Sequence, residues 1–165
     1  MTEHGDDNTR GALFVMRAGG RLFAIYAAEV EATAEGLAAT PLPRAPEAVR
    51  GVVSLRGRVR TVLDPLRIFA ARDATTATRA TNTSAQEHAD PRFFVALRGD
   101  EQLALACDGA EEMIELSRTQ LSPPTDAQAP TLGTFEHHGL TVNVLDPARL
   151  FEAAMQGTDR RRRRS

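Results

Sequence analysis

Short apolar runs alternate with turn residues along most of the chain, a pattern typical of small β-rich domains. The runs at 13–16 and 21–26 flank Gly19 and Gly20. They predict a β-hairpin, because glycine readily adopts the positive φ angles of a two-residue turn. The residues that follow, 28–35, suit either a short helical turn or a strand.

A second pair of strands is predicted at 51–55 and 59–64, on either side of Arg56 and Gly57. A passage with three prolines, 40–46, precedes this pair. It must be extended or looped, because proline fixes φ and lacks an amide hydrogen. An Asp-Pro step follows the pair and predicts a short helix, since Asp is a good N-cap and Pro suits the first helical position.

The chain contains an internal repeat. The segment from 57 to 69, GRVRTVLDPLRIF, recurs as GLTVNVLDPARLF from 139 to 151, shifted by 82 residues. Earlier elements recur at a shift of 80, so that Phe14 matches Phe94. This indicates two copies of one unit, each with about five strands and a capped helical turn, as in small barrels. The last helix is expected to stop at Gly157.

One segment does not fit this repeat. Residues 70–92 contain no Leu, Ile, Val, Met or aromatic side chain. Such a segment cannot bury enough apolar surface to offset its ordering entropy, so we predict a flexible insertion. The predicted organisation is one domain at 13–155, with a first barrel at about 13–69, a second barrel at about 93–151, and disordered tails at 1–12 and 158–165.

Composition and charge narrow the possible functions. The apolar fraction of 42% is ordinary, and with seven Phe, one Tyr and no Trp the core must be mainly aliphatic. The formal net charge is −2, but the five consecutive Arg at 160–164 contribute +5, so the remainder carries −7. This acidic body is a poor candidate for general nucleic-acid binding. The basic tail could contact anionic lipid, nucleic acid or a neighbouring acidic subunit, and these alternatives stay open.

Cysteine content and hydropathy bear on the cellular location. Cys107 is the only cysteine, which excludes an intrachain disulfide and a metal site with several Cys ligands. The N-terminus is polar rather than a secretory signal, and no apolar run approaches the length of a membrane span. These features predict a cytoplasmic location.

No combination of residues typical of catalysis is visible, such as a phosphate loop or a nucleophile with its base. His137 and His138 would point to opposite faces of a strand, and no Cys or close pair of carboxylates completes a metal site there. A hairpin turn is the favoured interpretation. Glu111 and Glu112 are sequence neighbours, which rarely converge as an acid–base pair. The sequence therefore predicts a protein that is not an enzyme and holds no metal or cofactor.

The segment GVVSLRGRVRTVLD at 51–64, with the proline-rich passage before it, resembles the CheW family, the coupling proteins of bacterial chemosensory arrays. In the second half, CDGAEEMIEL resembles the Asp-Gly segment of that family at Asp108 and Gly109. The resemblance covers the whole predicted domain apart from the insertion. The sequence departs from the family pattern at Ser54 and Pro65, where Asn and an aliphatic residue are usual, and this indicates a divergent or accessory member.

The resemblance implies a mainly β fold of two five-stranded, SH3-like barrels that share a hydrophobic interface, with short helices and a C-terminal helix. It implies a non-catalytic adaptor that bridges the cytoplasmic tip of a methyl-accepting chemoreceptor to the regulatory domain of a CheA-like histidine kinase. Such a protein needs no cofactor or small-molecule substrate, and it would lie at receptor arrays on the inner face of the membrane. The alternative is a divergent CheW-fold module for localisation or regulation that no longer couples receptor to kinase.

Arg56 is the strongest candidate binding residue. The repeat keeps the glycine of this turn but has His137 and His138 where the first copy has Leu55 and Arg56. A residue needed for the fold should persist in both copies, whereas a binding residue need not. The resemblance implies a receptor-binding groove whose aliphatic members would form apolar walls for a receptor helix. The predicted groove residues are Val30, Gly51, Val53, Ser54, Leu55 and Arg56.

One of these groove residues, and two further residues, also have a structural interpretation. Gly51 also suits a turn that the fold itself requires, because Gly133 repeats it. Arg67 and Arg149 recur in both copies, and we interpret them as cations that stabilise a helix C-terminus.

Overall fold

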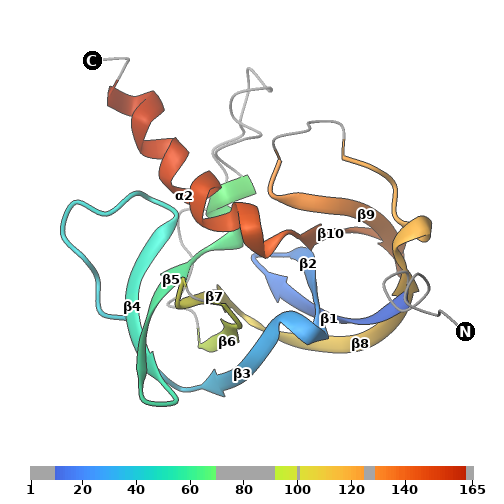
Figure 1. Cartoon of the computed structure of the whole chain (residues 1–165), viewed down its shortest axis with the longest axis horizontal. Helices are drawn as coiled ribbons and strands as arrows, with labels where there is room; N and C mark the ends of the chain where they lie inside the picture. Colours follow the sequence, from blue (N-terminus) through green and yellow to red (C-terminus); the bar gives the residue numbers. More distant parts are fainter. Residues whose placement is uncertain (1–9, 70–91, 100, 125–128, 163–165) are drawn as a thin grey trace, which may run out of the picture.

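The structure, a computed structural model, describes residues 10–69, 92–99, 101–124 and 129–162. The predicted insertion therefore lies, apart from Arg92, outside the described residues. Within them the chain forms strands, short helices and a C-terminal α-helix, with a short helix also at 65–69 (Figure 1). The strands are β1 (Arg10–Ala18), β2 (Arg21–Tyr26), β3 (Val30–Glu35), β4 (Val49–Leu55), β5 (Arg58–Leu63), β6 (Phe93–Leu97), β7 (Leu103–Cys107), β8 (Gly109–Ser117), β9 (Thr131–His137) and β10 (Leu140–Leu145), and the helices are η1 (Ala27–Glu29), η2 (Arg118–Gln120) and α2 (Pro147–Arg162).

The strands form two five-stranded mixed sheets. One sheet has the order β8-β1-β2-β10-β9, and the other has the order β3-β6-β7-β5-β4. Hairpin neighbours pair antiparallel, whereas β2 pairs parallel with β10 and β5 pairs parallel with β7. The prediction of a mainly β fold with two five-stranded units, short helices and a C-terminal helix is thereby confirmed.

The predicted assignment of each unit to one contiguous half of the chain does not match this topology. Hairpin β1–β2 joins β8, β9 and β10 from the second half, and hairpin β6–β7 joins β3, β4 and β5 from the first. The single turn η1 carries the chain from β2 in one sheet to β3 in the other, so residues 28–35 contain both predicted alternatives, a helical turn and a strand. The two halves thus exchange equivalent hairpins. In each sheet the exchanged hairpin pairs in parallel with a strand of the other half, so that an edge of that strand is not left unpaired.

Three clusters of buried side chains stabilise this arrangement. One lies within each sheet, and the largest lies between the two sheets and takes residues from both. Strand β6 shows why its sequence is a continuous apolar run: Phe93 and Val95 face the shared cluster, whereas Phe94 and Ala96 face the cluster of their own sheet. A strand that is covered on both faces has no position for a polar side chain.

Both Asp-Pro steps begin helices, as predicted. The carboxylate oxygen Oδ1 of Asp64 accepts hydrogen bonds from the backbone amides of Leu66 (3.0 Å) and Arg67 (3.4 Å). In the second copy, Oδ1 of Asp146 accepts one from the amide of Ala148 (3.1 Å). These bonds satisfy amides that have no partner inside the helix.

Arg149 lies in the first turn of α2, so the prediction that it stabilises a helix C-terminus is wrong, whereas Arg67 lies in the middle of the short helix at 65–69. Arg67 Nε lies 3.6 Å from Asp64 Oδ2, and Arg149 Nε lies 3.8 Å from Asp146 Oδ2. Each Arg follows its capping Asp by three residues and therefore reaches that carboxylate. Arg67 also donates through Nη1 to the carbonyl of Glu47 (3.0 Å), which ties the helix to the preceding loop.

The N-terminal boundary differs from the prediction. Strand β1 begins at Arg10, which pairs with Ser117 of the long strand β8. The predicted disorder is therefore wrong for residues 10–12, because β8 extends far enough to pair with them, and residues 1–9 lie outside the described part.

The C-terminal boundary differs as well. Helix α2 continues through Gly157 to Arg162, so the helix does not stop at that glycine as predicted. A glycine that ends a helix is usually followed by an apolar side chain that packs back on the last turn, and the residues after Gly157 are polar. In the part of the chain that the structure describes, no helix is both long and apolar enough to cross a membrane.

Candidate functional site

The tip of hairpin β4–β5 presents the main candidate, Arg56. Arg56 and Gly57 have φ angles of 57° and 74°, the positive values of a type I′ turn. The other copy repeats this geometry at His138 (51°) and Gly139 (78°). A positive φ costs a non-glycine residue roughly 1–2 kcal/mol. Both turns contain such a residue despite this cost. In the first turn the residue is Arg56, whose exposed side chain is presented at the tip of the hairpin.

An open groove of about 400 Å³ adjoins this hairpin. It lies between the loop after β3 and strands β4 and β5, and most of its lining residues are aliphatic. Val59, at the start of β5, is 65% exposed, so apolar surface continues onto the hairpin. The lining residues are Leu37, Ala38, Thr40, Val52, Val53, Ser54 and Val59.

Gly51 shapes the groove without lining it. Thr40 and Val52 exchange backbone hydrogen bonds of 2.8 and 2.9 Å, which draw the loop onto β4. An added Cβ on Gly51 would lie 2.1 Å from the carbonyl oxygen of Thr40, and Gly51 has a φ of 138°. The repeat reproduces this at Gly133, whose Cβ would lie 2.6 Å from the carbonyl oxygen of Ser122. The structure thus gives Gly51 the structural role that its repetition indicated.

The other predicted groove residues do not form one surface. Ser54 is exposed and Val53 is largely buried, yet both line the groove. Leu55 is 5% exposed and packs inside its sheet, so it supports the hairpin from within. Val30 lies on β3, at the opposite end of the sheet order from β4, and packs against the shared cluster. A role for these residues in receptor binding stays a prediction.

Sequence reasoning missed a buried arginine beneath this hairpin. Arg60 is 1% exposed; its Nη1 donates to the carbonyl of Leu97 (3.0 Å) and its Nη2 donates to Glu31 Oε2 (2.7 Å). Its buried Nε has no hydrogen-bond partner among the described residues. The hydrogen bond from Arg60 lowers the pKa of Glu31, against a smaller opposing effect of burial. The pairing of the hairpin could have indicated this burial, because Arg60 lies directly opposite Val53 of β4, whose apolar side chain faces inward.

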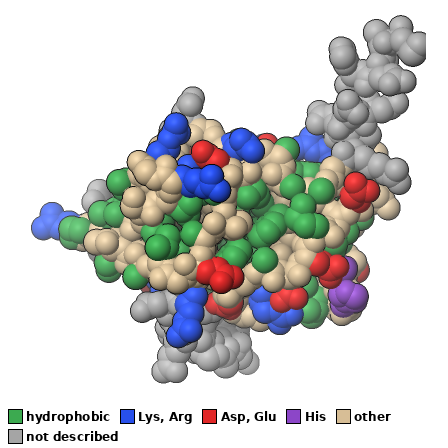
Figure 2. Space-filling model, turned by 90° about the horizontal axis from the view of Figure 1, so that it is seen from below, with side chains coloured by type: hydrophobic (Ala, Val, Ile, Leu, Met, Phe, Trp, Pro, Cys, Tyr) green, Lys and Arg blue, Asp and Glu red, His purple; other side chains and the backbone are tan. Residues whose placement is uncertain are grey.

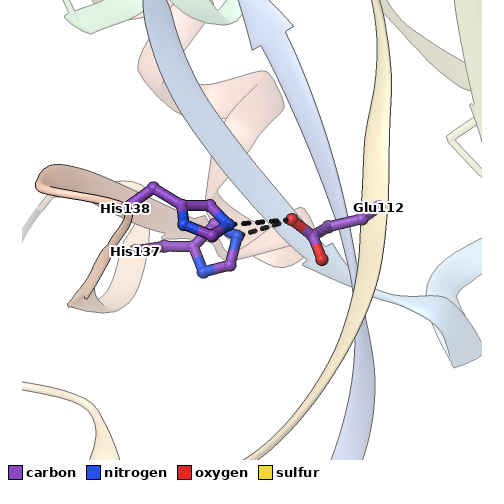
Figure 3. A group of neighbouring side chains, drawn as sticks. All are labelled: Glu112, His137 and His138. Carbon is purple, nitrogen blue, oxygen red and sulfur yellow. Dashed lines mark hydrogen bonds and ion pairs between the residues drawn. The ribbon is translucent and has the colours of Figure 1, made fainter.

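A second group of side chains lies on the other sheet. Glu112 Oε1 is 2.6 Å from His137 Nε2 and 3.5 Å from His138 Nε2, and the two imidazole centroids are 3.9 Å apart. In Figure 2 histidine side chains lie at the surface beside acidic ones, and Figure 3 shows both rings directed at the carboxylate. The prediction that the two histidines point apart is wrong, because His138 is a turn residue with positive φ rather than a strand residue. Glu111 pairs instead with Arg17 (2.6 Å).

Comparisons with known proteins agree on the fold. The family model of the CheW-like domain matches residues 12–155. Among solved structures, the crystal structure of the scaffolding protein TtCheW from Thermoanaerobacter tengcongensis matches with a TM-score of 0.61 and 16% identity, over 82% of this chain and 88% of that one. No curated protein matched the sequence. The family match spans both sheets, including the hairpin of Arg56, the groove beside it and the Glu112 group.

Proposed function

Because the chain belongs to the CheW-like domain family, we propose that this scaffolding domain couples chemoreceptors to a CheA-type histidine kinase. The observation that carries the proposal is the family match over 12–155, which spans both sheets. The scaffold acts by binding and needs no catalytic residue, in agreement with the prediction that the chain is not an enzyme. The proposed adaptor reaches the inner face of the membrane only through its receptors.

The groove beside hairpin β4–β5 supports the receptor part of this proposal. Its aliphatic lining suits the apolar face of an amphipathic helix, which is how helical partners usually dock in grooves. Arg56 and Arg58 are exposed at the adjoining hairpin, and their guanidinium groups can donate hydrogen bonds to partner carboxylates or carbonyls at the rim of the groove. A receptor tip with an apolar stripe flanked by acidic side chains is the partner that this chemistry fits.

The proposed function is tested by calorimetry of the full chain with the regulatory domain of the CheA-like kinase from the same organism, at physiological salt. We expect an affinity in the micromolar range or tighter. A folded sample that shows no binding would contradict the coupling role.

Receptor docking is tested separately by Arg56→Glu. Reversing the charge at the rim should weaken binding to a soluble receptor cytoplasmic fragment at least ~10-fold, about 1.4 kcal/mol, while kinase binding is unchanged. His138→Glu is the matched control, because it places the same side chain in the equivalent turn of the other sheet. EDTA is present in this assay so that metal ions do not bind to either protein. Receptor affinities that are equal in the two variants would argue against the site.

A further inference from the structure

The two edges of one sheet meet at Glu112. In the order β8-β1-β2-β10-β9, the strands β8 and β9 stand at opposite ends. Nevertheless Glu112 of β8 lies within hydrogen-bond distance of His137, the last residue of β9. The sheet therefore curves until its edges are within side-chain reach, and this group of three residues bridges the seam.

Two local irregularities bring the three side chains together. Strand β8 carries a bulge beside this point, since Val15 pairs with Glu112 and the next residue, Met16, pairs with Ala110. Bulges redirect side chains at sheet edges. On the facing hairpin, the positive φ of His138 turns its ring back toward that of His137. The backbone conformation thus brings two imidazoles and a carboxylate together.

The donor atoms suit a small divalent ion. One donor from each of Glu112, His137 and His138 lies within 4.8 Å of the other two. Zn²⁺ binds His nitrogen and carboxylate oxygen at ~2.0–2.2 Å, which places tetrahedral donors ~3.3 Å apart. The observed Glu112 distances of 2.6 and 3.5 Å bracket that value, and one nitrogen of each imidazole lies within 4.8 Å of the other. Two histidines with one Glu form a donor set that zinc proteins use when one coordination position stays open.

We propose that Glu112, His137 and His138 bind a divalent transition metal such as Zn²⁺ across the seam between β8 and hairpin β9–β10. His137, 20% exposed, is the most fixed of the three ligands. The side chains of Glu112 (47%) and His138 (76%) leave the site open to ions from solvent. Imidazole ligands favour zinc, copper and nickel over magnesium or calcium.

Bound metal would connect two strands that do not pair with each other. Because the three ligands come from both edges of the sheet, an ion bound only by the folded state stabilises that state. The fourth coordination position faces solvent and can take water or a donor from a second molecule. The site lies on a different sheet from Arg56, so it is independent of the proposed receptor groove.

The test is calorimetric titration of ZnCl₂ into the metal-free, untagged full chain. We expect one site that His138→Ala and Glu112→Gln each weaken at least ~10-fold, and a thermal midpoint that Zn²⁺ raises in the parent protein but not in these variants. Cys107 does not compete, because burial raises the pKa of its thiol to about 12. The double variant His4→Ala/His88→Ala controls for the other histidines and should bind normally.

His138 is mostly exposed, so in the absence of metal the His138→Ala variant should have the same thermal midpoint of unfolding as the parent protein. Glu112→Gln keeps the shape of the side chain and provides a second readout if the first variant is unstable. Substituting Co²⁺ for Zn²⁺ should give visible d–d absorption that both variants lose. Undisturbed Zn²⁺ affinity in the variants, or no uptake by the parent protein, would show that the three residues form only an ion pair. Neither result would alter the kinase-binding test of the proposed function.

Discussion

Gly51→Ala should lower the free energy of unfolding by roughly 3–4 kcal/mol. The new Cβ would lie 2.1 Å from the carbonyl oxygen and 2.6 Å from the carbonyl carbon of Thr40, where no side-chain rotation can relieve the overlap. A φ of 138° adds backbone strain for any L-residue with a side chain. The loop cannot simply withdraw, because the hydrogen bonds between Thr40 and Val52 hold it against β4.

Urea denaturation measures this loss, and Gly57→Ala is the matched control. Gly57 also has positive φ, at 74°, but an added Cβ would meet nothing within 4 Å, so it should cost only about 1–2 kcal/mol. Gly133→Ala should resemble Gly51→Ala, because its Cβ would lie 2.6 Å from the carbonyl oxygen of Ser122. Equal losses at Gly51 and Gly57 would show that close approach of the loop is not what this position requires.

Gly51 affects the shape of the groove as well as the stability of the fold. Thr40 lines the groove, and its position follows from the absence of a side chain on Gly51. A variant that relaxes by moving the loop away from β4 should therefore widen the groove and weaken a partner that docks there. Loss of partner binding in Gly51→Ala would then report altered loop position rather than a direct contact.

Local features of the fold could be predicted from the sequence. Gly19-Gly20 and Arg56-Gly57 marked hairpin turns, and the Asp-Pro step marked the helix starts, because these depend on backbone preferences of neighbouring residues. The repeat of Gly51 as Gly133 correctly indicated a backbone requirement. The shift of 82 residues even carries over to the bridges Thr40–Val52 and Ser122–Thr134.

Long-range pairing could not be predicted in the same way. The runs that became β6 and, after Arg21, β2 are apolar, so their pattern shows burial on both faces but not which strand lies beside them. The contiguous-barrel prediction assumed that each hairpin stays with its own half. The single turn η1 was enough to send the chain to the other sheet.

The polar groups were missed for related reasons. Alternation along a strand separates His137 from His138, but that rule does not extend to a residue in a positive-φ turn. Arg60 was not singled out, because the sequence alone does not show which of the arginines in this hairpin is buried. Only the tertiary structure shows that Glu31 and the carbonyl of Leu97 surround its guanidinium.

Arg60→Ala should destabilise the protein by about 3 kcal/mol, since truncating a buried, hydrogen-bonded charge removes both its bonds and its packing. The guanidinium joins β5 to β3 through Glu31 and to β6 through the carbonyl of Leu97, so the loss falls on contacts that hold three strands. Arg58→Ala, on the same strand but exposed, should change stability by less than about 0.5 kcal/mol. Arg60→Met keeps the stem, so stability that it recovers relative to Ala measures packing rather than hydrogen bonding.

The pH dependence of this loss separates the ion pair from the other contacts of Arg60. The pKa of Glu31 is lowered in the folded protein, chiefly by the hydrogen bond from Arg60, so the pairing stabilises the fold above the ordinary Glu pKa of about 4.3. This contribution is lost as the pH falls below that value and Glu31 takes up a proton. The parent protein should therefore lose more stability than Arg60→Ala between neutral and acidic pH, and the difference between them should narrow. Parallel stability curves for the two proteins would show that Arg60 acts through packing and the Leu97 carbonyl alone.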